Sequence, residues 1–263
     1  KGQLAQRIVS VGSLSRAQSV RQCFDEPAAA FELTSNRGFT TFTGTKDGVP
    51  VSVVATGMGF AMMDFFVREA RAVTEGPLVI VRFGSCGGLS DAEPGCVALN
   101  TPGSVAVRRN YDAFGQEHAL QAAKAPYMIS QPVKPDPIVL AGVCKQLTAA
   151  LGDERVIEGL NLSCDSFYSS QGRTDENFDD KNDELLDQVT DLEAVSMEME
   201  SFHLLHLAAC SKGSIRACTS AIIAAQRLTG AAITNDLLHE TEIVGGRAIL
   251  EALAQMEIDD LVA

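Results

Sequence analysis

Long hydrophobic runs are absent from this sequence of 263 residues. No apolar stretch approaches the length of a membrane-spanning helix, and residues 1–8 lack the apolar segment of a secretory signal. We therefore expect a soluble, cytoplasmic protein that does not bind membranes. The sequence opens almost directly on a strand-like segment, Arg7–Val11, so we also expect further residues upstream in the natural chain.

Basic residues are scarce as well. The 21 lysines and arginines stand against 34 acidic residues, which gives a formal net charge of −13. A protein of this charge repels polyanions, which argues against non-specific binding to nucleic acid or to an anionic membrane. Any phosphate group that the protein binds must therefore be met by local arginines.

Paired cysteine motifs are also missing. The seven cysteines are an odd number and include no C-x-x-C pair, so neither a disulfide framework nor a zinc site is indicated. We expect reduced thiols and no bound metal. Cys86 has no recognisable histidine partner in the sequence, so we do not expect a nucleophilic thiol.

No linker-like stretch and no internal repeat divides the chain, so we predict one domain over residues 1–263. A chain of this length buries roughly three-quarters of the surface that it exposes when unfolded, enough for a core without covalent staples. The predicted strands are Arg7–Val11, Phe31–Ser35, Thr40–Lys46, Val49–Ala55, Leu78–Phe83, Cys96–Asn100, Ser104–Arg108, Arg155–Leu162 and Ile215–Ala225. The predicted helices are Ser15–Cys23, Met62–Val73, Pro137–Leu151, Asn182–Asp191, Met199–Lys212 and Asn235–Ala254.

This alternation of strands and long helices favours an α/β fold. Asp47-Gly48 is a strong hairpin signal, which makes the sheet mixed rather than purely parallel. We predict a three-layer αβα sandwich around a central, mixed, twisted sheet. The acidic segment 174–191 is expected to be a solvated loop that runs into a short helix, with a pocket lid or a divalent-ion site as the alternative.

The segment Val9–Arg16 is typical of a strand that ends at a glycine, Gly12, and turns directly into a helix. Backbone amides at such a turn attract an anion, and Arg16 adds a positive charge one turn into the helix. A plain strand-to-helix connection with a surface arginine is the alternative, and the spacing alone favours it.

A second glycine-rich segment, Arg82–Leu89, follows an apolar strand. An arginine at the end of a buried strand is costly unless it meets an anion. The glycines allow a ligand to approach backbone amides, and the Ser85 hydroxyl can bind phosphate. The alternative is a glycine turn in which Arg82 pairs with a structural carboxylate.

The polar segment Ser163–Arg173 contains two adjacent aromatic residues, Phe167 and Tyr168. An aromatic face beside an amide and a guanidinium, here Gln171 and Arg173, can stack on a base and read the edge of a uracil. A surface loop whose aromatic residues pack downward explains the same pattern.

The segment Ser196–Ser201 contains two glutamates, Glu198 and Glu200, and we expect it to open an apolar helix. Residues two apart cannot share one helical face, so the two carboxylates have different roles. One of them could bind the vicinal hydroxyls of a sugar, whereas a charge effect at the helix start accounts for either.

In this order, from Val9 to about Ala254, these segments resemble the uridine phosphorylase branch of the nucleoside phosphorylase family. The resemblance implies phosphorolysis of uridine to uracil and ribose 1-phosphate, with inorganic phosphate as co-substrate and without a cofactor. It places Gly12, Arg16, Arg82 and Ser85 at the phosphate. It also matches Arg37 to an arginine that reaches the phosphate of a neighbouring subunit, which implies a homo-oligomer, at least a dimer.

The same resemblance implies a ribose site and a base site. The implied ribose ligands are Ser85, Glu198, Met199 and Glu200. The implied base-binding residues are Cys86, Gly87, Phe167, Gln171, Arg173 and Arg227. The implied catalytic residues are Arg82, Gln171, Arg173 and Glu200.

Substrate class depends on one position of this resemblance. Purine-specific relatives protonate the base with an aspartate at a position that aligns near Gln226, and no acid is present there. Gly38 replaces a glutamate that binds a monovalent cation in some relatives, so no metal is carried over. A family histidine upstream of the first strand would precede this sequence.

Four other functions stay open at this point. Two share the fold, a nucleosidase and a purine nucleoside phosphorylase; a non-catalytic nucleoside binder is the third. A Rossmann oxidoreductase is the most distant, because Met62 stands where the third glycine of Gly57-x-Gly59 should be. The sequence leaves undecided whether thymidine or deoxyuridine is accepted.

Overall fold

The computed structural model describes residues 2–114 and 125–258. Its centre is a mixed sheet in which the two longest strands, β5 (Leu78–Gly88) and β12 (Ile215–Gln226), pair in parallel. On the other side of β5 lies β1 (Arg7–Val11), parallel to β5 and to β4 (Val49–Ala55). The apolar first half of β5 is buried on both faces, as strands inside a parallel sheet are.

The predicted hairpin makes the sheet mixed. β4 is antiparallel to β3 (Thr40–Lys46), and the turn between them is Asp47-Gly48. The edge strand β2 (Phe31–Thr34) is antiparallel to β3. A further antiparallel pairing joins β11 (Ala194–Glu198) to the end of β5, so the prediction of a mixed sheet is confirmed.

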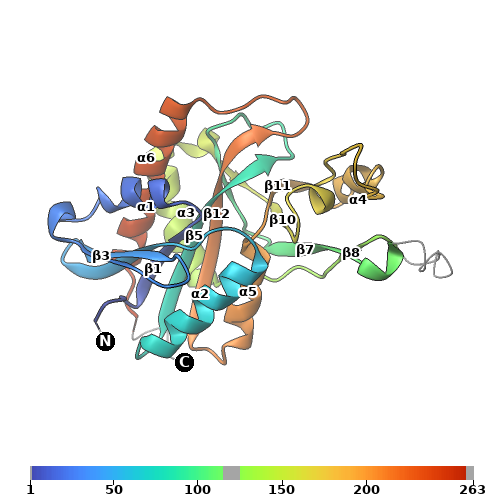
Figure 1. The fold of residues 1–263 in the computed structure, drawn as a ribbon. Helices are drawn as coiled ribbons and strands as arrows, with labels where there is room; N and C mark the ends of the chain where they lie inside the picture. The colour runs from blue at the N-terminus through green and yellow to red at the C-terminus, as the bar shows by residue number, and fades with distance from the viewer. Residues whose placement is uncertain (1, 115–124, 259–263) are drawn as a thin grey trace.

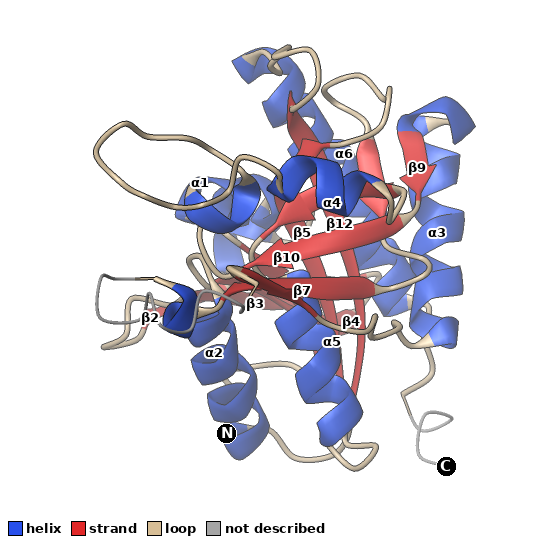
Figure 2. Ribbon diagram, turned by 90° about the vertical axis from the view of Figure 1, so that its right-hand side faces the viewer, coloured by secondary structure: helices blue, strands red, loops and turns tan. Residues whose placement is uncertain are grey.

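Helices cover both faces of the sheet (Figures 1 and 2). One face carries α1 (Leu14–Arg21), α3 (Pro137–Leu151) and α6 (Asn235–Ala254), whose apolar residues share a core cluster with β1, β5 and β12. The other face carries α2 (Phe60–Val73) and α5 (Ser201–Cys210), which pack on a second cluster. The predicted three-layer sandwich is therefore confirmed. None of the helices in the described part of the chain is long and apolar enough to cross a membrane.

The predicted strand Arg155–Leu162 is wrong in one respect, because the chain breaks at Gly159. β9 (Val156–Glu158) pairs with β6 (Val97–Leu99), whereas β10 (Leu160–Cys164) lies between β11 and β7 (Ser104–Arg109). A Cβ atom at Gly159 would lie 2.3 Å from the Val195 side chain, so the change of partner needs a glycine. The sequence analysis also missed β11 and the short strand β8 (Tyr127–Ile129).

The acidic segment is a loop followed by a short helix, α4 (Leu185–Thr190), as predicted, but it is not wholly solvated. Asp180 is buried and accepts a 2.6 Å hydrogen bond from Nη1 of Arg109. The side-chain Nδ2 of Asn182 donates to the backbone carbonyls of Ser169 and Arg173. The segment therefore supports the loop that contains Phe167 and Arg173.

Candidate active site

All five sequence motifs contribute residues to the lining of one cavity of about 360 Å³, the Gly57-x-Gly59 motif through Met58. The cavity forms where β11 separates from β5. The two strands pair only through Ser196 with Gly88 and Met197 with Gly87, and the chain after Met197 then reaches Arg82 of β5 through Glu200. Twelve of the fourteen predicted site residues line this cavity. They are Gly12, Arg16, Arg82, Ser85, Cys86, Gly87, Phe167, Gln171, Arg173, Glu198, Met199 and Glu200.

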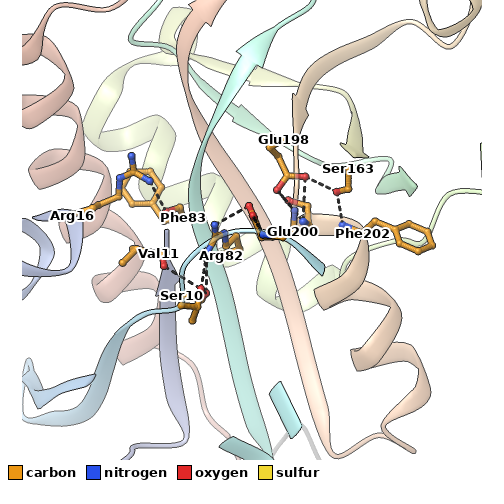
Figure 3. A network of polar contacts seen from close by, with 12 residues as sticks. Ser10, Val11, Arg16, Arg82, Phe83, Ser163, Glu198, Glu200 and Phe202 are labelled. Carbon is orange, nitrogen blue, oxygen red and sulfur yellow. Dashed lines mark hydrogen bonds and ion pairs between the residues drawn. The ribbon is translucent and has the colours of Figure 1, made fainter. Parts of the chain in front are cut away.

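Arg82 lies at the bottom of the cavity and is 2% exposed. Its Nη1 donates to the hydroxyls of Ser10 and Thr56 at 3.2 and 3.0 Å. Its Nη2 donates to Oε2 of Glu200 at 2.9 Å, as Figure 3 shows. The Nε of Arg82 has no partner among the described residues, so one buried donor stays available to an anion.

The Arg82–Leu89 motif is strand through Gly88, whereas the predicted strand ends at Phe83 and a glycine turn was the alternative. β5 continues through Gly88, and Ser85 is its one exposed position in this stretch. Gly12 faces the same place, because a Cβ atom there would lie 3.4 Å from Nη2 of Arg82. The glycines thus keep side chains away from Arg82, as an anion site requires.

Cys86 differs from its neighbour Ser85. Its thiol donates to the carbonyls of Ala221 and Ile222 on β12, and burial raises the pKa of the thiol. The thiol is thus bound to the core rather than directed at the cavity. Its predicted role at the base is limited to the main chain.

Glu200 lies just before α5 and reaches Arg82 from the opposite wall. Its second oxygen accepts a 2.5 Å hydrogen bond from the amide of Gly59. Burial raises the pKa of the Glu200 carboxyl, while Arg82 acts in the opposite direction. A buried carboxylate held by two donors at the cavity wall is suited to accept sugar hydroxyls.

Glu198 ends β11 and does not open a helix, which corrects the prediction from the sequence. Its oxygens accept hydrogen bonds from Nδ2 of Asn161 at 2.8 Å and from the Ser163 hydroxyl at 2.5 Å. They also accept the amides of Glu200 and Ser201 at 2.9 Å each. Each oxygen of Glu198 already has at least two donors, so it lines the cavity without a free acceptor for ribose.

Another part of the cavity lining is formed by Phe167, Gln171 and Arg173. Nη1 of Arg173 donates to Oε1 of Gln171 at 2.6 Å and to the carbonyl of Phe167 at 2.7 Å. The guanidinium of Arg173 also lies 3.9 Å from the centre of the Phe167 ring. Gln171 is buried, whereas Phe167 is 48% exposed and free to stack on a planar ligand.

Two of the predicted site residues do not line the cavity. Arg227 borders a neighbouring cavity with Leu89 and Leu186, and its Nη1 lies 3.8 Å from the sulfur of Met197. Arg37 is outside, in the turn between β2 and β3, where it binds Glu69 at 2.5 Å. A single chain therefore presents Arg37 on its surface, away from its own site.

Several residues around the cavity were missed by the sequence analysis. Ser10 and Thr56 hold Arg82, and Gly59 holds Glu200. Gly57-x-Gly59 is a visible signal in the sequence, although its pattern is typical of an incomplete dinucleotide motif and not of a contact to a carboxylate. Glu242, which binds Arg16, left no local signal because it lies 226 residues away.

A family model described as the phosphorylase superfamily matches residues 6–255, so the chain belongs to that superfamily. Among solved structures, one from a study of two uridine phosphorylases of the oomycete Phytophthora capsici is similar with a TM-score of 0.90 and 40% identity. That match covers 97% of this chain and 92% of the other. The resemblance to the uridine phosphorylase branch and the fold that it implied are both confirmed.

More distant relatives include purine enzymes. Part of the chain is 34% identical to a DeoD-type purine nucleoside phosphorylase of Geobacillus sp. over 89 residues, 34% of this chain and 37% of that protein. The match to the Bacillus velezensis protein of the same name is 32% identical and covers 44% of this chain and 49% of that protein. The chain thus spans less than half the length of the curated relatives it matches. A Toxoplasma gondii purine nucleoside phosphorylase shares the fold at 19% identity, with a TM-score of 0.71 over 96% of this chain and 91% of that one.

Proposed function

We propose that the protein is a uridine phosphorylase, which cleaves uridine with inorganic phosphate to uracil and ribose 1-phosphate. The observation that carries this proposal is the lining of one cavity, which combines the buried arginines Arg16 and Arg82 with the Gln171–Arg173 pair beside Phe167. The similarity to a Phytophthora capsici uridine phosphorylase structure at 40% identity supports it.

In this proposal, phosphate binds next to Arg16, Arg82 and Ser85, with amides near Gly12 as further donors. We take the Nε of Arg82, which has no partner among the described residues, as a further donor to this anion. The ribose lies against Met199, and its hydroxyls bind Glu200. Uracil stacks on Phe167 and binds Gln171 and Arg173, whose amide and guanidinium match its carbonyl and N–H groups.

The reaction is a displacement at C1′ of the ribose. The C1′–N1 bond breaks, its electron pair leaves with the uracil ring, and a phosphate oxygen forms the new bond to C1′. The sugar carries positive charge in the transition state, which Glu200 and the phosphate stabilise. Arg173 and Gln171 stabilise the negative charge that grows on the leaving uracil. The protein forms no covalent intermediate.

In this proposal, substrate binding changes the partners of one ion pair and one hydrogen bond. Without ligands, Arg82 binds Glu200 and Arg173 binds Gln171. Phosphate and ribose compete for the first pair, and uracil competes for the second. The charges are thus held in place before the substrates arrive, which lowers the cost of organising them in the transition state.

Phosphorolysis of purine nucleosides is the second candidate, favoured by the partial sequence matches to DeoD-type enzymes. Protonation of a purine base requires an acid near the base end of the cavity. At the position where such an acid would stand, Gln226 is buried, and its Nε2 donates to the carbonyls of Ser90 and Ala92 at 2.7 Å each. An amide cannot supply the proton, which supports the pyrimidine assignment.

The deciding experiment follows the ultraviolet absorbance of uridine with and without millimolar phosphate, with inosine as the purine control. Phosphate-dependent cleavage of uridine alone is the expected result. Cleavage without phosphate would identify a nucleosidase, cleavage of inosine a purine enzyme, and binding of uridine without cleavage a nucleoside binder. Each of these three outcomes would contradict the proposal.

A further inference from the structure

Arg16, one of the three arginines that line the cavity, is held by a carboxylate from the last helix. Glu242 of α6 is 7% exposed, and its Oε1 accepts a 3.0 Å hydrogen bond from Nε of Arg16. Its Oε2 accepts a 3.2 Å hydrogen bond from the Ser19 hydroxyl, which itself lies 3.3 Å from Nδ1 of His239. Glu242 does not line the cavity.

The hydrogen bonds of Arg16 leave one side of its guanidinium for a ligand. Nε donates to Glu242, and Nη1 donates at 3.5 Å to the carbonyl of Phe83, a contact visible in Figure 3. An arginine has five N–H groups, so these two bonds leave three, all on the terminal nitrogens. Two terminal nitrogens in a fixed plane are the donor pattern that binds phosphate in bidentate fashion.

Stability alone does not explain this ion pair. Removing two charges from water costs several kcal/mol per ion, and a buried pair is on average no more stable than apolar side chains of similar volume. Arg16 is 5% exposed, and burial lowers the pKa of its guanidinium while Glu242 acts in the opposite direction. A buried pair whose cation borders a ligand cavity has a more specific use, which is to fix the orientation of that cation.

We propose that Glu242 is a positioning residue of the phosphate site: it holds the Nε edge of Arg16, so that the terminal nitrogens face the phosphate. This inference rests on the proposed function, because it takes the anion at Arg16 to be inorganic phosphate. Glu242 acts through a hydrogen bond more than through its charge. Its negative charge opposes an anion nearby, whereas the orientation it gives to Arg16 favours one.

Two substitutions separate these effects. Glu242→Gln removes the charge and keeps an oxygen that accepts from Arg16, while its amide can donate to the Ser19 hydroxyl. Glu242→Ala removes both the charge and the hydrogen bond. Asp136→Asn is the matched control, because Asp136 binds Arg216 at 3.1 Å in a partly buried ion pair that does not line the cavity.

Binding of inorganic phosphate alone, measured by titration calorimetry on each variant, tests the proposal without the chemical step. We expect Glu242→Ala to weaken phosphate binding about tenfold, or about 1.4 kcal/mol. Glu242→Gln should stay within about threefold of the unchanged protein or bind phosphate more tightly, since a like charge is gone. Binding of uracil should change less than about twofold in both, and Asp136→Asn should bind phosphate normally.

The outcomes separate this inference from the proposed function. Equal phosphate binding by the unchanged protein and Glu242→Ala would overturn the positioning role alone. Weak binding by both Glu242 variants would also overturn it, because the charge and not the hydrogen bond would then matter. Failure of the unchanged protein to bind millimolar phosphate would overturn the proposed function, and the inference with it. A melting temperature for each variant identifies any loss that comes from unfolding.

Discussion

Arg82 and Glu200 form a buried ion pair across the cavity, with 2.9 Å between Nη2 and Oε2. The two side chains are 118 residues apart in the chain and are assigned to different substrates, phosphate and ribose. If the proposed function holds, the pair couples the two binding sites, because a change in either side chain removes the partner of the other.

We expect Glu200→Gln to lower kcat/KM for uridine about 100-fold, the scale of removing one pre-organised group from a transition state. The KM for phosphate should stay the same or fall, because Arg82 loses its competing carboxylate. Steady-state kinetics with each substrate varied in turn measures both effects. A parallel rise in both KM values would contradict the separate roles.

Arg173→Met should lower kcat by about 100-fold or more, since it removes the cation that stabilises the leaving uracil. Phosphate binding should remain within about twofold of normal. A uridine analogue with a more acidic base should recover part of the lost rate, because its leaving group needs less stabilisation. Equal damage to kcat and phosphate binding would refute this role for Arg173.

Glu198→Ala is expected to destabilise the fold by about 3 kcal/mol, because it removes one bond each from Asn161 and Ser163 and leaves the buried amides of Glu200 and Ser201 without a partner. Chemical denaturation measures the loss. If Glu198 bound ribose directly, the same change would raise the KM for uridine and leave the stability nearly unchanged. The two readouts distinguish these roles.

Arg37 should act in the neighbouring subunit. We expect Arg37→Ala to raise the KM for phosphate about tenfold, the effect of losing one charge-assisted contact. Arg37→Ala and Arg173→Met chains, unfolded and refolded together, should regain activity, because a mixed dimer contains one site with neither substitution. No recovery in proven mixed dimers would show that Arg37 serves its own chain or no site.

His203 gives the stability a predictable pH dependence. Burial lowers the pKa of His203, against the effect of Asp64. A folded-state pKa below the unfolded value means that stability is lost as pH falls below about 6.5, by at most about 1.4 kcal/mol per pH unit. His203→Phe keeps a ring beside Phe60, 5.3 Å away, and removes this titration.

The measurement is denaturation of both proteins at pH 7.5 and pH 5.5. Relative to the unchanged protein, the His203→Phe variant should become more stable at the lower pH. A constant difference between the two proteins would mean that His203 does not titrate in this range.

The sequence by itself determined the class of fold. Apolar strands, capped helices and the Asp47-Gly48 turn are local signals. The periodic spacing of apolar residues predicts which side of each strand or helix is buried, and therefore how the element packs in the sandwich. The resemblance of ordered motifs added the superfamily and the residues of the cavity. Gly159 shows the limit of such signals, because the break between β9 and β10 depends on a side chain 36 residues later, Val195.

Only the tertiary structure decided which partner each charged group has. Arg82 could have met any anion, but it meets Glu200 because β11 leaves β5 at Met197. Glu198 and Glu200 are nearly adjacent in sequence and both line the cavity, yet Glu198 is bonded to Asn161, Ser163 and two backbone amides, whereas Glu200 pairs with Arg82. The reason is geometric: hydrogen bonds act over about 3 Å, and only the packed chain brings such distant groups that close.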